Sequence, residues 1–174
     1  FNTHDIASTF EFGKKKVGLE LFANYFKTDG YNLSESDFLQ TIEPYFNVTI
    51  QQKVTINFSD KINFSLNTRF FNQNQVYKAE VASNLYDGTS KNTEFNNSIL
   101  LNHTITKNFK LVYDLYVTNY EAFEYLNDQN KQFFDASNFL QWFYRTEVRS
   151  HYKMGKNTVT TGVGTNYETL NRTF

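Results

Sequence analysis

The sequence predicts an all-β protein built from antiparallel strands of a transmembrane up-and-down β-barrel. Apolar and polar residues alternate along segments of about a dozen residues, which is the period of a strand with two different faces. The connections between these segments alternate between short turns and long loops, as they do in membrane barrels. Aromatic residues make up 18% of the 174 residues and gather near the ends of the predicted strands. We expect about eight strands from this pattern.

The clearest alternation lies between Phe46 and Phe58. Every second residue of this segment is apolar except Gln52, and the residues between them are polar. A strand places such residues on opposite faces, whereas a helix would mix them. At roughly 3.3 Å per residue, the segment is long enough to cross a bilayer as a tilted strand.

The same alternation recurs along the chain. It is clear in residues 17–26, 62–67, 94–105, 109–118 and 140–152, and weaker in residues 6–12 and 159–167. The mean hydropathy of −0.57 agrees with a barrel, because the polar face of each strand offsets the apolar face.

Connections of two lengths separate the predicted strands. Short turns fall at residues 13–16, 59–61, 107–108 and 155–157, and each contains Gly, Asn, Asp or Lys. Long loops are predicted at residues 28–45, 73–93 and 121–137. Outer-membrane barrels have their short turns on the periplasmic side, so we expect the long loops to be extracellular.

The order of these connections predicts where the chain ends lie. The first predicted strand is followed by a short turn, and the last is preceded by one. Both chain ends are therefore expected on the long-loop side, whereas a complete barrel is expected to have both ends in the periplasm. We interpret residues 1–174 as part of one barrel domain whose remaining strands lie outside the chain.

Aromatic and lysine residues mark the predicted strand ends. The aromatic residues expected to form two interfacial girdles are Phe12, Tyr25, Phe46, Phe58, Phe70, Phe109, Tyr144, Tyr152 and Tyr167. The alternative is the core of a soluble β-sandwich, which would have shorter strands and more even connections. Lysines at the short turns fit solubility and protection of sheet edges, and contact with anionic headgroups is the alternative.

Charged residues on the polar faces are expected to line the barrel lumen. The predicted lumen-lining residues are the charged residues Glu20, Asp114, Arg145, Glu147 and Arg149 and the amide Asn24. Charges of alternating sign along one wall suggest salt bridges within the lumen, or contacts with a plug that fills it.

Aromatic residues in the predicted long loops are candidates for binding a ligand. They are Tyr31, Tyr77, Tyr86, Phe123 and Tyr125. Aromatic rings beside polar groups suit an organic or chelate ligand, and the alternative is that the loops pack on one another over the barrel mouth.

The composition excludes several other functions. The chain has no Cys, and its three His lack the spacing of metal ligands. A net charge of −1 provides no basic field for nucleic acid. No carboxylate pair stands out as an acid and base, so we expect no enzymatic activity, metal or cofactor.

The segment Leu21-Phe22-Ala23-Asn24-Tyr25-Phe26-Lys27-Thr28-Asp29-Gly30-Tyr31-Asn32 resembles a barrel hairpin of TonB-dependent receptors, especially those of Bacteroidota. The strand Tyr144-Arg145-Thr146-Glu147-Val148-Arg149 and the turn Gly155-Lys156-Asn157 resemble the same family. The resemblance is one of general sequence pattern over the whole chain, and it includes no strict motif. It implies a plugged barrel of about 22 strands, integral to the bacterial outer membrane.

That resemblance also implies a function and partners. Such receptors import siderophores, haem, cobalamin or similar scarce nutrients with energy from the TonB complex. The implied partners are outer-membrane lipid, a plug domain of the same protein, the TonB complex and surface lipoproteins. Neither a plug nor a TonB box falls within these residues. The alternatives are a passive porin, an outer-membrane enzyme such as a lipid hydrolase, and a structural or secretion-associated barrel.

Overall fold

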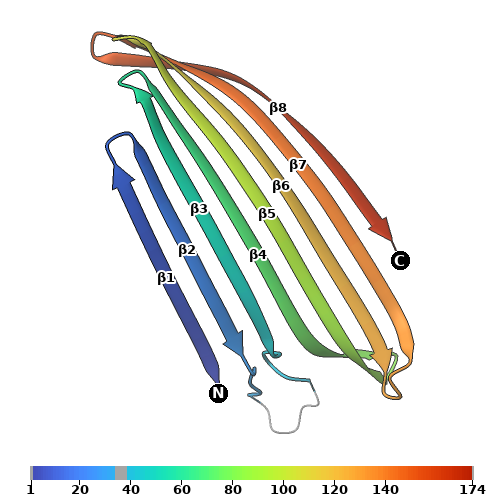
Figure 1. Cartoon of the computed structure of the whole chain (residues 1–174). Coiled ribbons are helices and arrows are strands. Elements are labelled where there is room, and N and C mark those ends of the chain that lie inside the picture. Colours follow the sequence, from blue (N-terminus) through green and yellow to red (C-terminus); the bar gives the residue numbers. More distant parts are fainter. Residues whose placement is uncertain (1, 34–38, 174) are drawn as a thin grey trace.

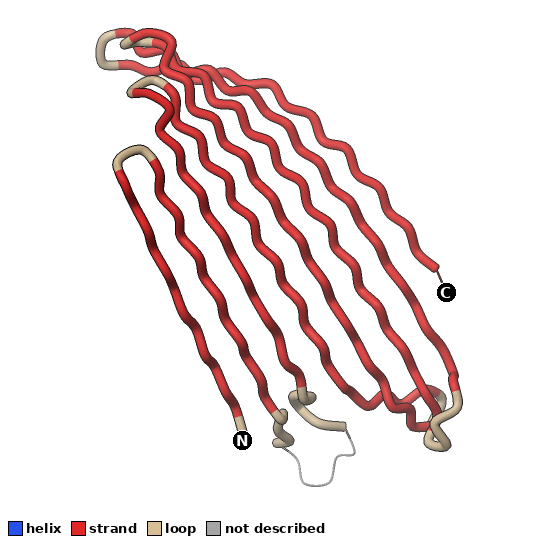
Figure 2. The backbone as a smooth tube through the Cα atoms, viewed as in Figure 1, coloured by secondary structure: helices blue, strands red, loops and turns tan. Residues whose placement is uncertain are grey.

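The computed structural model describes residues 2–33 and 39–173, which form one sheet of eight strands in sequence order (Figure 1). The strands are β1 (Thr3–Lys14), β2 (Val17–Thr28), β3 (Tyr45–Ser59), β4 (Ile62–Val81), β5 (Asn84–Thr106), β6 (Phe109–Asp128), β7 (Phe133–Met154) and β8 (Asn157–Thr173). Figure 2 shows strands joined by loops over this part of the chain. None of it is a helix that is long and apolar enough to span a lipid bilayer.

Every strand pairs antiparallel with its sequence neighbours. The predicted all-β antiparallel architecture and the count of about eight strands are therefore confirmed. Within the described residues, β1 pairs only with β2 and β8 pairs only with β7, so the sheet has two open edges.

The four predicted short turns are confirmed. They link β1 to β2, β3 to β4, β5 to β6 and β7 to β8, and all lie at one end of the sheet (Figure 1). Lys15 and Gly155 have φ angles of 49° and 60°, which tight hairpins require. We call this end the short-turn end, and the opposite end the distal end.

Two of the three predicted long loops are wrong. The segment 73–93 is instead the continuation of β4 and β5, which meet at a two-residue turn of Ala82 and Ser83. Both turn residues have positive φ angles, 50° and 64°, as a type I′ turn demands. That turn type favours Asn-Gly, so the Ala-Ser pair gave no hairpin signal in the sequence.

The segment 121–137 is likewise mostly strand. β6 continues to Asp128 and β7 begins at Phe133, so the connection is only a few residues long. The third prediction, a long loop over residues 28–45, agrees with the long connection between β2 and β3. Residues 34–38 of that loop lie outside the described residues.

The register places the alternating residues on two distinct faces. Across β2 to β6, one row of paired positions is Leu19, Val54, Leu66, Ile99 and Leu115. The next row, on the other face of β3 to β7, is Lys53, Asn67, Ser98, Tyr116 and Arg145. We call the first the apolar face and the second the polar face.

The apolar face has no protein layer over it. Phe10, Ile50 and Val163 on this face are 58%, 51% and 74% exposed. Val112 is the one buried apolar side chain in residues 2–33 and 39–173. The described chain is therefore a single sheet without a hydrophobic core between two layers, and its apolar side chains require a partner outside the sheet.

The apolar residues form a band that does not reach the distal end. On β4 the apolar-face positions run from Ile62 to Phe70, with Thr68 among them, and then change to Asn72 and Asn74. The apolar band consists of Phe10, Phe12, Val17, Leu19, Leu21, Val48, Ile50, Val54, Ile56, Ile62, Phe64, Leu66, Phe70, Phe95, Ile99, Leu101, Ile105, Leu111, Leu115, Val117, Leu140, Val148, Val159 and Val163. Beyond it, residues 72–81, 84–93, 119–128 and 133–138 are the distal segments of β4 to β7.

Aromatic contacts lie at both limits of the apolar band. Near the short-turn end, the ring centroids of Phe109 and Tyr152 are 6.4 Å apart. Towards the distal end, Trp142 stacks on Tyr144 with centroids 6.0 Å apart, and Tyr144 lies 6.1 Å from Tyr167. Of the aromatic residues predicted at strand ends, Phe109 and Tyr152 lie near the ends of β6 and β7, whereas Phe70 and Tyr144 lie in the middle of β4 and β7.

Candidate functional site

The centre of the polar face holds a cluster of two arginines and two carboxylates on β6 and β7. Asp114 Oδ2 lies 3.5 Å from an amino nitrogen of both Arg145 and Arg149. The Arg149 side chain also lies 3.1 Å from Glu147 Oε1. Alternate residues of β7 share a face, which is why these three project together towards Asp114 on the neighbouring strand.

A second ion pair extends this cluster across the sheet. Arg69 on β4 and Glu94 on β5 are paired at 2.7 Å, and the Asn96 amide donates to the same carboxylate oxygen at 3.4 Å. The Tyr116 hydroxyl donates to Asn96 Oδ1 at 2.9 Å. A polar network therefore runs over β4, β5 and β6.

Tyr116 joins the two ion-pair groups. The Arg145 guanidinium lies over the Tyr116 ring, 5.5 Å from its centroid, within the range of a cation–π interaction. The combined set, Arg69, Glu94, Asn96, Asp114, Tyr116, Arg145, Glu147 and Arg149, is called the central network below. Its side chains come from four consecutive strands.

The central network is not internally satisfied. Asp114 has only 13% of its side chain exposed, yet its Oδ1 atom has no hydrogen-bond partner, and neither does the buried Nε of Arg145. A buried polar atom without a partner costs about 1–3 kcal/mol. The side chains of Arg145 and Arg149 are 43% and 39% exposed, so their guanidinium groups remain accessible to a polar group that approaches the polar face.

The six residues predicted to line a lumen do share the polar face, but they form two separate groups. Asp114, Arg145, Glu147 and Arg149 belong to the central network. Asn24 instead donates from Nδ2 to Asp5 Oδ1 at 2.6 Å, and Glu20 lies between Glu11 and Lys53 in the register. Both of these lie on β2, several strands from the arginines.

The five predicted ligand-binding aromatics do not form one site. Only Tyr31 lies in a long loop, where it bridges Ile42. Tyr77 on β4, Tyr86 on β5, and Phe123 and Tyr125 on β6 are strand residues. Their expected place in loops is wrong, because the strands extend through these segments.

The register also separates these aromatics by face. Tyr77 and Tyr86 lie on the polar face, and Tyr86 contacts Phe134 with ring centroids 4.1 Å apart. Phe123 and Tyr125 lie on the opposite face. A single ligand on one side of the sheet cannot contact all four.

Tyr77 has a specific local role at the distal end. Its ring lies over Gly88 on β5, so close that a Cβ atom on Gly88 would overlap it. Burial raises the pKa of the Tyr77 hydroxyl, and the Glu124 charge raises it further. The ring and glycine therefore fit each other, and the hydroxyl stays neutral.

Arg69, Asn96 and Tyr116 are not among the predicted lumen-lining residues. Each of these residues occupies a polar-face position in the alternation of apolar and polar residues along its strand. That alternation was the sequence signal that could have identified them. Their connection depends on the register of β4 and β5, and that register follows from the Ala82–Ser83 turn. Aromatic residues on the polar face were also missed; they include Phe26 stacked on Tyr45 with centroids 5.4 Å apart.

No metal site is formed by the described chain: residues 2–33 and 39–173 contain no group of three or more His, Asp or Glu that could hold an ion. Comparisons with protein-family models, with curated proteins and with solved structures gave no match. The geometry of the sheet is therefore the basis for assigning a function.

Proposed function

We propose that this sheet is part of the wall of a TonB-dependent receptor in a bacterial outer membrane. The receptor would import a scarce nutrient such as a siderophore, haem or cobalamin. The observation that carries the proposal is the exposed apolar band on one face of a single sheet. Lipid covers such a face without a second protein layer.

The height of the band supports a membrane position. From Ile62 to Phe70 it extends about 26 Å along β4, at roughly 3.3 Å per residue. At a barrel tilt of about 40° this gives about 20 Å along the membrane normal, close to the apolar band of about 25 Å in outer-membrane barrels. The aromatic groups at both limits of the band, around Phe109 and Trp142, agree with two interfaces.

The two open edges favour a barrel with more strands than these eight. Unpaired backbone groups at the edges of β1 and β8 are costly in lipid, where no water is available to them. Further strands would pair with both edges and close the wall. The sheet then forms one sector of the barrel.

The polar face favours a filled barrel over a water-filled pore. Aromatic residues on this face include Phe22, Phe26, Tyr45, Phe71, Tyr116, Tyr120, Phe139 and Phe143. A porin lumen is lined by polar side chains in water, whereas these rings gain by packing against protein. A plug domain of the same protein would cover them and could pair with the partly exposed side chains of Arg145 and Arg149.

The distal segments supply the extracellular part of this receptor. They extend β4 to β7 beyond the apolar band and carry polar residues such as Asn72, Asn74 and Glu121 on the face that continues from it. Surface lipoproteins and ligand would meet the receptor at this end, and the TonB complex would act from the short-turn side.

Uptake by intact cells tests the proposal. Cells with and without the intact gene are supplied with labelled ferric siderophores, haem and cobalamin, before and after an uncoupler dissipates the proton-motive force. We expect uptake of at least one ligand to require the gene and to stop with the uncoupler. Gene-dependent entry of small solutes that the uncoupler leaves unchanged would instead identify a passive porin.

A further inference from the structure

The charged residues divide sharply between the two ends of the sheet. The lysines within residues 11–20, 53–63, 102–112 and 151–159, at the short-turn end, are Lys14, Lys15, Lys16, Lys53, Lys61, Lys107, Lys110, Lys153 and Lys156. The acids in the same segments are Glu11, Glu20 and Asp60. The short-turn end is therefore strongly basic, although the chain as a whole has a net charge of −1.

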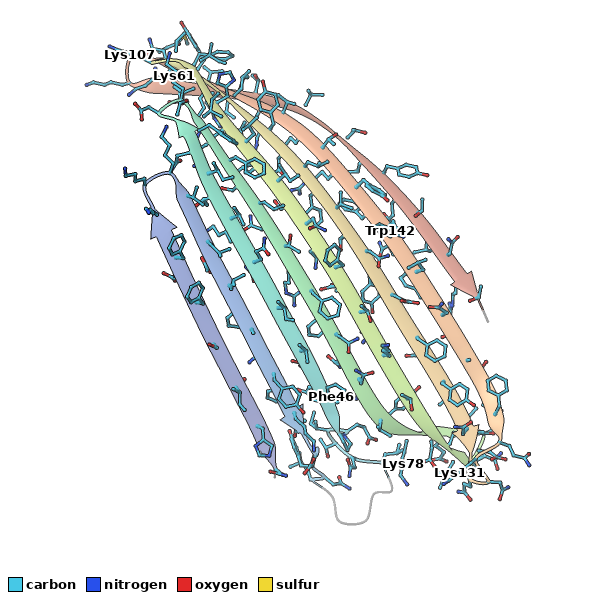
Figure 3. The ribbon with its side chains drawn as sticks, in the orientation of Figure 1. Phe46, Lys61, Lys78, Lys107, Lys131 and Trp142 are labelled. Carbon is cyan, nitrogen blue, oxygen red and sulfur yellow. The ribbon has the colours of Figure 1, made fainter. Side chains whose placement is uncertain are left out.

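The distal end has the opposite charge. Its acids, on the described parts of the β2–β3 loop and on the distal segments, include Asp29, Glu43, Glu80, Asp87, Glu121, Glu124, Asp128 and Asp135. Its lysines include Lys27, Lys78, Lys91 and Lys131. Figure 3 shows Lys61 and Lys107 at one end of the sheet, and Lys78 and Lys131 at the other.

The lysines of the short turns lie where the apolar band ends, whereas Lys53 and Lys110 lie on the polar face. Each of the four short turns carries at least one lysine, and the turns project past exposed aromatic side chains of the band limit. Phe58 and Tyr152 there are 57% and 47% exposed. A lysine stem can extend along such apolar surface while its ammonium group reaches the headgroup region.

Protection of sheet edges does not account for this distribution. The edge strand β8 has no lysine, and the other edge strand, β1, has only Lys14 at its last position. The lysines instead follow the ends of all hairpins, including those in the middle of the sheet. Edge protection would place these lysines along β1 and β8.

We propose that the short-turn end binds the phosphates of anionic glycerophospholipids in the leaflet next to it. This inference rests on the proposed membrane barrel and adds a lipid preference to it. Lysines near an anionic membrane surface are attracted to its negative charge. A row of lysines at one level would collect anionic lipid around that rim and leave the acidic distal end without it.

A pair of tryptophan reporters on one strand tests this directly. The chain has one Trp, Trp142, which lies towards the distal limit of the band on β7. Tyr152→Trp combined with Trp142→Phe moves the reporter to the short-turn limit of the same strand. The intact protein, with every tryptophan outside residues 1–174 replaced by phenylalanine, is reconstituted in mixed phosphatidylcholine and phosphatidylglycerol vesicles in which only one lipid carries bromine high on its acyl chains.

The expected result is unequal quenching by the two lipids. Brominated phosphatidylglycerol should quench the reporter at position 152 at least about twofold more than Trp142, relative to brominated phosphatidylcholine. Equal ratios at the two positions would overturn the lipid preference while leaving membrane insertion intact. Absence of quenching by either lipid at both positions would overturn the proposed barrel itself.

Charge variants add a matched control. Lys15→Gln, Lys107→Gln and Lys156→Gln together remove three charges from three short turns. Lys27→Gln, Lys91→Gln and Lys131→Gln remove three from the distal end. The first set should abolish the phosphatidylglycerol preference at position 152 and the second should retain it; loss with both sets would show a response to net charge alone and contradict a local lipid site.

Discussion

The sheet contains two regions of different strand length. β1 and β2 have 12 residues each and β3 has 15, whereas β4 to β7 have 20 to 23. All begin or end at the same set of short turns, so the additional length of β4 to β7 projects at the distal end. There the alternation of apolar and polar residues stops, but the strands continue. The length of a strand and the height of its apolar band are therefore separate properties.

The largest expected effect compares the band with a distal segment on one strand. Leu66→Arg and Val76→Arg both lie on the apolar face of β4. In the proposed membrane barrel, Leu66→Arg should lower the free energy of unfolding by about 2–4 kcal/mol, because its charge would lie at membrane depth, and Val76→Arg by about 0–1 kcal/mol. Urea unfolding of the reconstituted protein measures both, and equal losses would remove the distinction between band and distal segment.

A smaller effect is expected within the central network. Asp114→Asn weakens the pairing of Arg145 and Arg149 without changing the size of the side chain. We expect a loss of about 1–2 kcal/mol, because two partly buried guanidinium groups lose their shared counterion. Glu121→Gln, an exposed acid on the same strand, should change stability by less than about 0.5 kcal/mol. A similar small change at Asp114 would mean that the network contributes little.

Substitutions of two glycines, one on the short strand β1 and one on the long strand β5, test how tightly each strand is packed. Gly88→Val should cost about 1–2 kcal/mol, because its side chain would displace the Tyr77 ring. Gly13→Val on β1 meets no atom within 4 Å and should be neutral or stabilising in a strand. Thermal denaturation of the two variants checks this, and Tyr77→Ala should relieve the cost at Gly88→Val.

The smallest effect concerns the turn at the tip of β4 and β5. Ser83→Gly should stabilise this hairpin by about 0.5–1 kcal/mol, because glycine adopts a positive φ without the steric cost of a side chain. Slower hydrogen exchange of the amides near residues 80–86 would report it. Asn84→Gly, one residue later in the strand, should destabilise the hairpin and speed the exchange of these amides. Faster exchange in both variants would argue against the positive φ at Ser83.

The sequence was sufficient for the strands within the band. Alternation located all eight strands and the Gly, Asn, Asp and Lys signals located the four short turns. Alternation failed as a predictor beyond the band, because both faces of β4 to β7 carry polar residues there. Apolar and polar residues no longer alternate in those segments. The Ala82–Ser83 turn has no glycine or proline, so nothing marked it.

The candidate site was predictable only in part. Arg145, Glu147 and Arg149 could be assigned to one face because they alternate on a single strand. Their contact with Asp114, and the link through Tyr116 to Arg69 and Glu94, requires the registers of three strand pairs. Registers depend on turn positions, so one missed turn concealed half of the central network.

The strictly sequential strand order has a consequence for how the chain folds. Every pairing joins neighbours in the sequence, so each hairpin closes a short stretch of chain and pays little loop-closure entropy. Assembly can proceed by adding one hairpin at a time to a growing edge, with the finished strands acting as a template for the next. Until β1 and β8 are covered, the same edges are open to pairing with other chains. The time that the nascent sheet spends with uncovered edges would then set the competition between productive folding and aggregation.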